Sequence, residues 1–166
     1  MRDDPFVKVL RQVGDRKADP RVVVLVAHGL IELMINTLVD HSCRNAKAIT
    51  SDTRGYPYST KLIILHEKGV VPDSFFETLE RFRRLRNDAA HQPFFDVDAS
   101  RIRQIAEPME KHLPPREEGQ TYPSDSLNDF CGYLVHSLFS QFQGVLLPIF
   151  APSVHKALND QQSNAS

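Results

Sequence analysis

The hydrophobic positions of the chain recur with helical spacing over most of its length. Five apolar residues in the segment 73–91 follow one another at steps of three or four: Phe75, Leu79, Phe82, Leu85 and Ala89. Such steps place side chains on one face of a helix. The β-branched run "VVVLV" at 22–26 continues with helical spacing well beyond the length of a strand. The pattern therefore predicts an all-α protein, a bundle of about five or six helices.

Start and stop signals set the expected helix boundaries. Asp19 followed by Pro20 is typical of an N-cap and a first helical residue, and predicts a long helix to about His41. Ser74 and Glu77 have the spacing of a capping box. Gly69 is expected to close the helix before them.

The remaining segments complete the expected bundle. Further helices are predicted at 4–14, 58–69, 73–92, 98–113 (broken or kinked near Pro108) and 125–147 (ended by Pro148). The polar segments 43–59 and 114–126 are predicted to be loops. Within the long helix, polar residues occur at every fourth position: His28, Glu32, Asn36 and Asp40. We expect them to form one narrow stripe that faces solvent, a partner or a site.

Length and charge limit the classes of protein that fit. A chain of 166 residues without internal repeats predicts a single helical domain at 1–158, followed by a disordered polar tail at 159–166. The net charge of −1 excludes bulk attraction for nucleic acid, so polyanion binding requires a local patch. The N-terminus does not resemble a signal peptide, and the apolar stretch 22–39 carries three polar side chains. A cytoplasmic protein without membrane association is therefore expected.

The side chains best suited to catalysis or phosphate binding lie in the segment "RFRRLRNDAAHQ", residues 81–92. On a helix, Asn87 and His91 are one turn apart on one face, and Arg86 lies about 100° round from Asn87. A neutral imidazole can accept or donate a proton near pH 7, and a guanidinium can stabilise phosphate charge. Asn87 could fix the imidazole or hold a phosphate oxygen. The three residues therefore suit phosphodiester chemistry without a metal or cofactor, and the other histidines show no metal-binding spacing.

The "RNDAAH" of 86–91 resembles the R-N-x-x-x-H form of the HEPN superfamily signature. The order of "PRVVVLVAHGLIELMINTLVDH", "YSTKLIILHEKGVV" and "LERFRRLRNDAAH" is similar to that of the mannitol operon repressor branch, over about residues 19–92. The resemblance implies an all-helical homodimer whose two motif helices face across a shared cleft. Many members are metal-independent endoribonucleases that act as toxins or in defence, and others are regulators without demonstrated chemistry.

Two functions are therefore open. In the first, the protein cleaves single-stranded RNA, with His91 as general acid and base, Arg86 stabilising phosphate charge and Asn87 positioning one or the other. In the second, a transcriptional regulator or interaction module uses the same residues to bind an antitoxin or regulatory protein, and has no catalytic activity.

Four further residues are candidates for binding. Arg81, Arg83 and Arg84 form either a phosphate-steering patch or a solvated helix face paired with nearby glutamates. Glu32 lies in an apolar helix, where a buried carboxylate needs a partner, and Arg86 is its candidate cation.

Overall fold

The computed structural model describes residues 5–113 and 121–150, and over these ranges the chain forms helices and no strand. The all-α prediction is confirmed. Six helices have ten or more residues: α1 (Pro5–Gly14), α2 (Pro20–Ser42), α4 (Tyr58–Glu67), α5 (Asp73–His91), α6 (Ala99–Glu110) and α7 (Leu127–Gln141). Shorter elements are α3 (Ala46–Ser51), the 3₁₀ turn η1 (Pro123–Asp125) and a helical segment at 143–150. The predicted tail at 159–166 lies outside the described residues.

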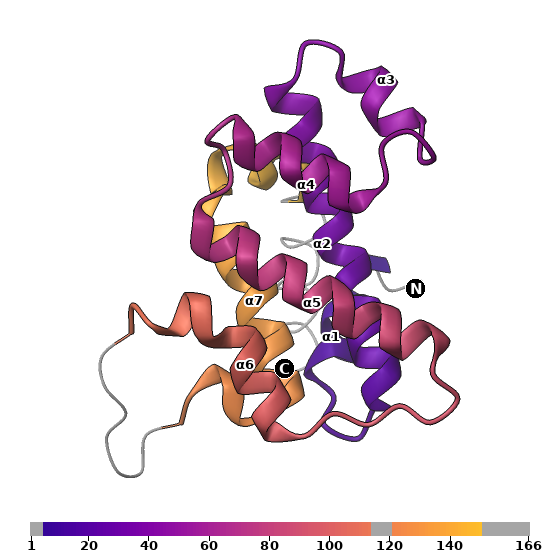
Figure 1. Cartoon of the computed structure of the whole chain (residues 1–166), viewed down its shortest axis with the longest axis vertical. Coiled ribbons are helices and arrows are strands. Elements are labelled where there is room, and N and C mark those ends of the chain that lie inside the picture. The colour runs from indigo at the N-terminus through magenta and orange to yellow at the C-terminus, as the bar shows by residue number, and fades with distance from the viewer. Residues whose placement is uncertain (1–4, 114–120, 151–166) are drawn as a thin grey trace, which may run out of the picture.

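The central element is α2, which runs along the long axis of the molecule and is crossed by α5 (Figure 1). It contacts α1, α3, α4, α5 and α7. In the described ranges it is the one helix that length and composition would allow to cross a membrane, and 56% of its most apolar window is buried within the bundle. Burial of this kind is typical of the core helix of a soluble bundle.

Two predicted boundaries are confirmed by their local chemistry. The side chain of Asp19 accepts a hydrogen bond from the backbone N–H of Arg21 at 2.8 Å, with Pro20 at the first helical position. Gly69 follows α4 with φ of +67°, a left-handed conformation that favours glycine. Both boundaries depend on one or two residues, which is why the sequence alone could locate them.

Two other expectations are wrong. The predicted loop 43–59 contains α3, a six-residue helix that buries Ala46 and Ile49 against the bundle. The capping box of Ser74 does not form, because α5 begins at Asp73 after Pro72 and has no side-chain cap.

The expected break at Pro108 is also absent, since α6 continues through it to Glu110. Proline lacks the N–H that would bond to the carbonyl four residues earlier, which is that of Gln104. The guanidinium of Arg81 on α5 donates to this carbonyl instead. A side chain of the neighbouring helix therefore provides the hydrogen bond that Pro108 cannot, and the helix continues.

The C-terminal helix differs from the prediction at both ends. It begins at Leu127, where the side chain of Ser126 accepts from the N–H of Asp129 at 3.1 Å, and ends at Gln141. A turn at Phe142 separates it from the helical segment 143–150, which passes through Pro148. Pro148 therefore does not end the helix, and the break comes earlier.

The core contains apolar side chains from every α-helix of the bundle, with Phe82 and Phe130 among the largest fully buried. Their rings meet edge to face at 6.0 Å. Cys131 of α7 is also fully buried, and burial raises the pKa of its thiol to about 12. Cys43, just after α2, is half-buried, and neither cysteine is in a disulfide.

Candidate functional site

The helix α5 carries Arg86, Asn87 and His91 on the sides left open by its packing. Leu85 and Ala89 are fully buried and fix the face that α5 turns to the core. Arg86 and Asn87 are consequently half-buried, and Nη1 of Arg86 donates to Oδ1 of Asn87 at 3.4 Å. The imidazole of His91, in the last turn, is exposed and has no hydrogen bond or ion pair within the described ranges.

Arg86 and His91 point to different sides of α5. Five residues along an α-helix correspond to about 7.5 Å along the axis and about 140° around it. Arg86 is turned toward α2, and His91 toward solvent at the end of the helix. A single chain therefore holds an exposed imidazole and a half-buried guanidinium on different sides of the same helix.

On α2, the polar residues at every fourth position do not form one stripe with a single environment. Each step of four residues turns about 40° beyond a full circle on an α-helix. His28 is accordingly buried, Glu32 and Asn36 are half-buried, and Asp40 is exposed. These four residues therefore turn from the interior at His28 to the solvent at Asp40, and His28 is close enough to Arg86 for that cation to lower its pKa.

His28 forms a buried polar pair with Tyr58 of α4. Their ring centroids are 4.6 Å apart, and Nε2 of His28 and the hydroxyl of Tyr58 are both buried without a hydrogen-bond partner. Burial, and then the nearby cations Arg86 and Arg83, lower the pKa of His28 from 6.5 to about 4. Burial also raises the pKa of Tyr58, with help from Glu80 and Glu32. Both groups are therefore neutral near pH 7. Nothing in the sequence around Tyr58 predicted this pair.

Glu32 does not pair with Arg86 as the sequence suggested. Its Oε2 lies 3.9 Å from Nδ1 of His28, and its side chain is 41% exposed. The next polar residue, Asn36, accepts a hydrogen bond from Nζ of the buried Lys61 at 2.9 Å. The guanidinium of Arg86 is therefore not held by a buried carboxylate in the described part of the chain.

The three arginines before Arg86 have different environments. Arg81 contacts Glu107 of α6 at 2.8 Å and lies 3.9 Å from Glu77. Arg83 forms a bidentate ion pair with Glu80, in which Nη2 of Arg83 donates to Oε2 of Glu80 at 2.9 Å. Arg84 is exposed and makes no described ion pair. Of these three arginines, Arg84 alone has no ion pair in the described ranges, and the environments of Arg81 and Arg83 fit the alternative of a helix face paired with glutamates.

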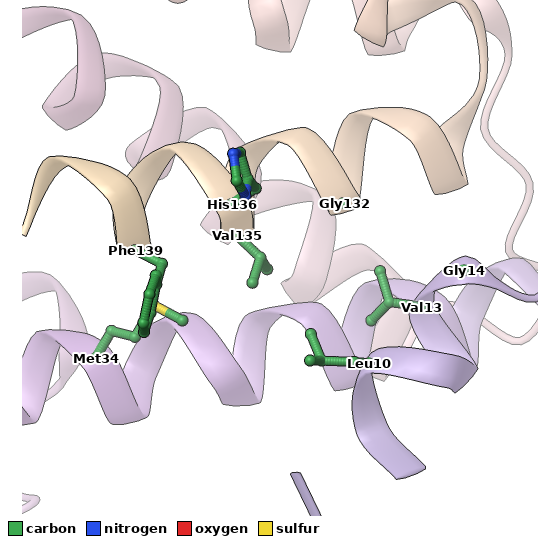
Figure 2. Close-up of a pocket in the computed structure, with 8 residues that line it drawn as sticks. All are labelled: Leu10, Val13, Gly14, Met34, Gly132, Val135, His136 and Phe139. Atoms are coloured by element: carbon green, nitrogen blue, oxygen red, sulfur yellow. The ribbon is translucent and has the colours of Figure 1, made fainter. Parts of the chain in front are cut away.

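An apolar pocket of about 310 Å³ lies elsewhere, between α1, α2 and α7. Val135 and Phe139 project from α7 toward the helices that carry Leu10, Val13 and Met34 (Figure 2). Its polar group is the imidazole of His136, which lies 3.4 Å from the Ser140 hydroxyl. No residue of α5 lines it, so this pocket is separate from Arg86 and His91.

No protein-family model matches the chain, and neither a curated protein nor a solved structure matches it.

Proposed function

We propose that this protein is a HEPN-like, metal-independent endoribonuclease that cleaves single-stranded RNA in the cytoplasm. The observation that carries the proposal is the state of His91. Its imidazole is exposed and has no hydrogen-bond or ion-pair partner in the described ranges. A general acid or base needs an imidazole that is free to exchange protons with substrate, and the exposed His91 meets this condition.

The proposed reaction is a transesterification within the RNA. A neutral His91 removes the proton of a ribose 2′-hydroxyl, and the oxygen attacks the adjacent phosphorus. The bond to the 5′-oxygen breaks as that oxygen receives a proton from a protonated imidazole. The products are a 2′,3′-cyclic phosphate and a 5′-hydroxyl, and no metal or redox partner is required.

Arg86 is proposed to stabilise the charge that builds on the phosphate oxygens, and Asn87 to orient the guanidinium through the 3.4 Å contact of their side chains. Because one imidazole cannot be base and acid in the same step, two copies of His91 in a symmetric homodimer would divide the two tasks. The homodimer would also bring Arg86 of one protomer toward His91 of the other.

The outer face of α2 offers a surface for such a dimer. Val22 and Val26 are half-buried, Gly29 is exposed, and Leu33 is 48% exposed. Together they form a partly exposed apolar strip along one side of α2, where Val26 also packs against the core. Exposed apolar surface of this kind supports protein–protein contact.

The same strip supports the alternative function. In that case the protein is a non-catalytic, repressor-like regulator that binds an antitoxin or another regulatory protein, and Arg86 with His28 is a structural contact. The half-burial of Arg86 beside His28 favours this alternative. The two functions differ in what His91 must do, because only the ribonuclease requires its proton transfer.

The test compares RNA cleavage by the wild type, His91→Ala and Arg86→Ala, each with EDTA present. We expect the wild type to cleave single-stranded RNA and to leave cyclic phosphate ends. His91→Ala should lose about 10²- to 10⁴-fold in rate, since that is the usual contribution of general acid–base catalysis. His41→Ala is the matched control, because His41 is an exposed histidine at the end of another helix. Equal cleavage by wild type and His91→Ala would eliminate the mechanism.

A further inference from the structure

The segment between α5 and α6 presents an aromatic ring almost completely to solvent. Phe94 is 95% exposed, whereas the next most exposed large apolar side chain in the described ranges, Ile149, is 58% exposed. Its neighbour Phe95 is half-buried and packs against the core. The half-buried Phe95 therefore anchors the segment, while Phe94, in the bend at 93–94, is directed outward.

The backbone that carries Phe94 is held in place. Nη2 of Arg21, in the first turn of α2, donates to the carbonyl of Gln92 at 2.7 Å and to that of Pro93 at 3.1 Å. The pyrrolidine ring of Pro93 also fixes its own φ. The backbone at Phe94 is thus pre-organised, and a ligand that stacks on the ring binds with little loss of conformational entropy in this segment.

Phe94 follows His91 by three residues in the chain. Three residues of chain span at most about 11 Å, so the two side chains can contact neighbouring units of one ligand. Arg84 lies two turns before His91 on the same side of α5, is exposed and makes no described ion pair. A cation, an imidazole and an aromatic ring therefore follow one another along this edge of the molecule. Phosphate, ribose and base follow one another in the same way along single-stranded RNA.

Three carboxylates lie within six residues of Phe94, and one of them has a described ion pair. Asp88 pairs with Arg101. The carboxylates of Asp96 and Asp98 accept hydrogen bonds from the backbone N–H groups of Val97 and Arg101, both at 2.8 Å. The surroundings therefore supply little attraction for phosphate, and stacking must supply a large part of any affinity at this position.

We propose that Phe94 stacks on an unpaired nucleobase of single-stranded RNA and so positions the adjacent ribose and phosphate at His91. The inference rests on the proposed ribonuclease function and names the group that would hold the substrate. Aromatic stacking is tolerant of sequence, because every base has a flat face. Selection would thus be for single-stranded over double-stranded RNA, and not for a particular base.

The chain contains no tryptophan, which makes the inference directly testable. Phe94→Trp introduces a single indole whose fluorescence is quenched when a base stacks on it. The titrant is a 2′-O-methylated oligouridylate, which cannot be cleaved because its 2′-oxygen carries no proton. We expect saturable quenching for this variant. Ile63→Trp, on the half-exposed surface of α4, should show none.

The affinity of the wild type is measured in parallel by the anisotropy of a labelled oligonucleotide. Phe94→Leu should weaken binding by about 5- to 150-fold, the range that corresponds to the loss of one stacked base, and Phe94→Tyr should preserve it. The wild type should bind duplex RNA more weakly than single-stranded RNA. Phe94→Leu should bind the two forms of RNA with equal affinity.

Each failure has a distinct meaning. The stacking role is wrong if RNA binds Phe94→Trp without quenching its fluorescence, or if Phe94→Leu binds RNA as tightly as the wild type does. It is also wrong if the wild type binds no RNA. If Phe94→Ala dissociates an oligomer and the indole is already shielded without RNA, the ring is a subunit contact and the inference is wrong. Quenching by RNA in a protein that cleaves no RNA would leave the stacking intact and remove the ribonuclease proposal.

Discussion

Replacement of His28 by leucine should remove a specific part of the protein's sensitivity to acid. The imidazole is 4% exposed, packs against Tyr58, and has a buried Nε2 without a partner. Burial, and then the nearby cations Arg86 and Arg83, lower its pKa from 6.5 to about 4. The carboxylate of Glu32 at 3.9 Å is too distant and too exposed to reverse this. Leucine has a similar volume and cannot bind a proton.

The sign and size of the effect follow from the two pKa values. Between pH 6.5 and pH 4 the unfolded chain binds a proton at His28 that the folded chain does not, so acid favours unfolding. The stability associated with the neutral imidazole is complete above pH 6.5 and is lost as the pH falls toward 4. Linkage gives a loss of about 2 kcal/mol between pH 7.5 and pH 5, and about 3 kcal/mol by pH 4.

The assay is chemical denaturation of the wild type and His28→Leu at pH 7.5 and pH 5. Other carboxylates and histidines titrate in both proteins, so the difference between them isolates residue 28. We expect the wild type to lose about 2 kcal/mol more than the variant, or about 4–8 °C in melting temperature for a chain of this size. At pH 7.5 the variant should be at least as stable, since it removes a buried unpaired nitrogen. Parallel losses in both proteins would refute a buried, neutral His28.

Two further substitutions probe the helix boundaries and the α5–α6 contact. Gly69→Ala forces a side chain into a φ of +67° and should cost about 1 kcal/mol by thermal melting, and an unchanged melting temperature would argue against this turn. Arg81→Ala leaves the carbonyl of Gln104 without the donor that replaces the missing N–H of Pro108, and should cost about 1 kcal/mol. Arg84→Ala is its control, with an expected change below about 0.5 kcal/mol because Arg84 is exposed and unpaired.

Much of the fold could be predicted because its signals are local. The N-cap Asp19, the left-handed Gly69 and the apolar spacing of α5 each depend on a few neighbouring residues. Features that depend on another helix were not accessible in this way. Whether Pro108 interrupts α6 is decided by Arg81 on α5, through its contact with Gln104, 23 positions away in the sequence. The short α3 is stable because it buries Ala46 and Ile49, and its composition alone resembles a loop.

The candidate site shows the same division. The positions of Arg86, Asn87 and His91 on one helix, and the angles between them, follow from their spacing. Their environments do not, because they depend on how α5 packs against α2, which brings Arg86 close enough to His28 to lower the pKa of that imidazole. Tyr58 lies on a third helix, and its unpartnered hydroxyl gives no signal in the sequence. Proximity of this kind is set by the packing of three helices, and a single sequence does not encode it in any short motif.

The different burial of the two cysteine thiols allows alkylation to measure how often the helical bundle opens. Cys43, half-buried after α2, is the more exposed of the two, and we expect it to react first with an alkylating reagent. Cys131 is fully buried in α7, and its high pKa keeps it unreactive in the native state. The first equivalent of reagent therefore reacts with Cys43 in the native state. The rate at which Cys131 consumes the second equivalent reports how often the bundle opens around α7, without any introduced label.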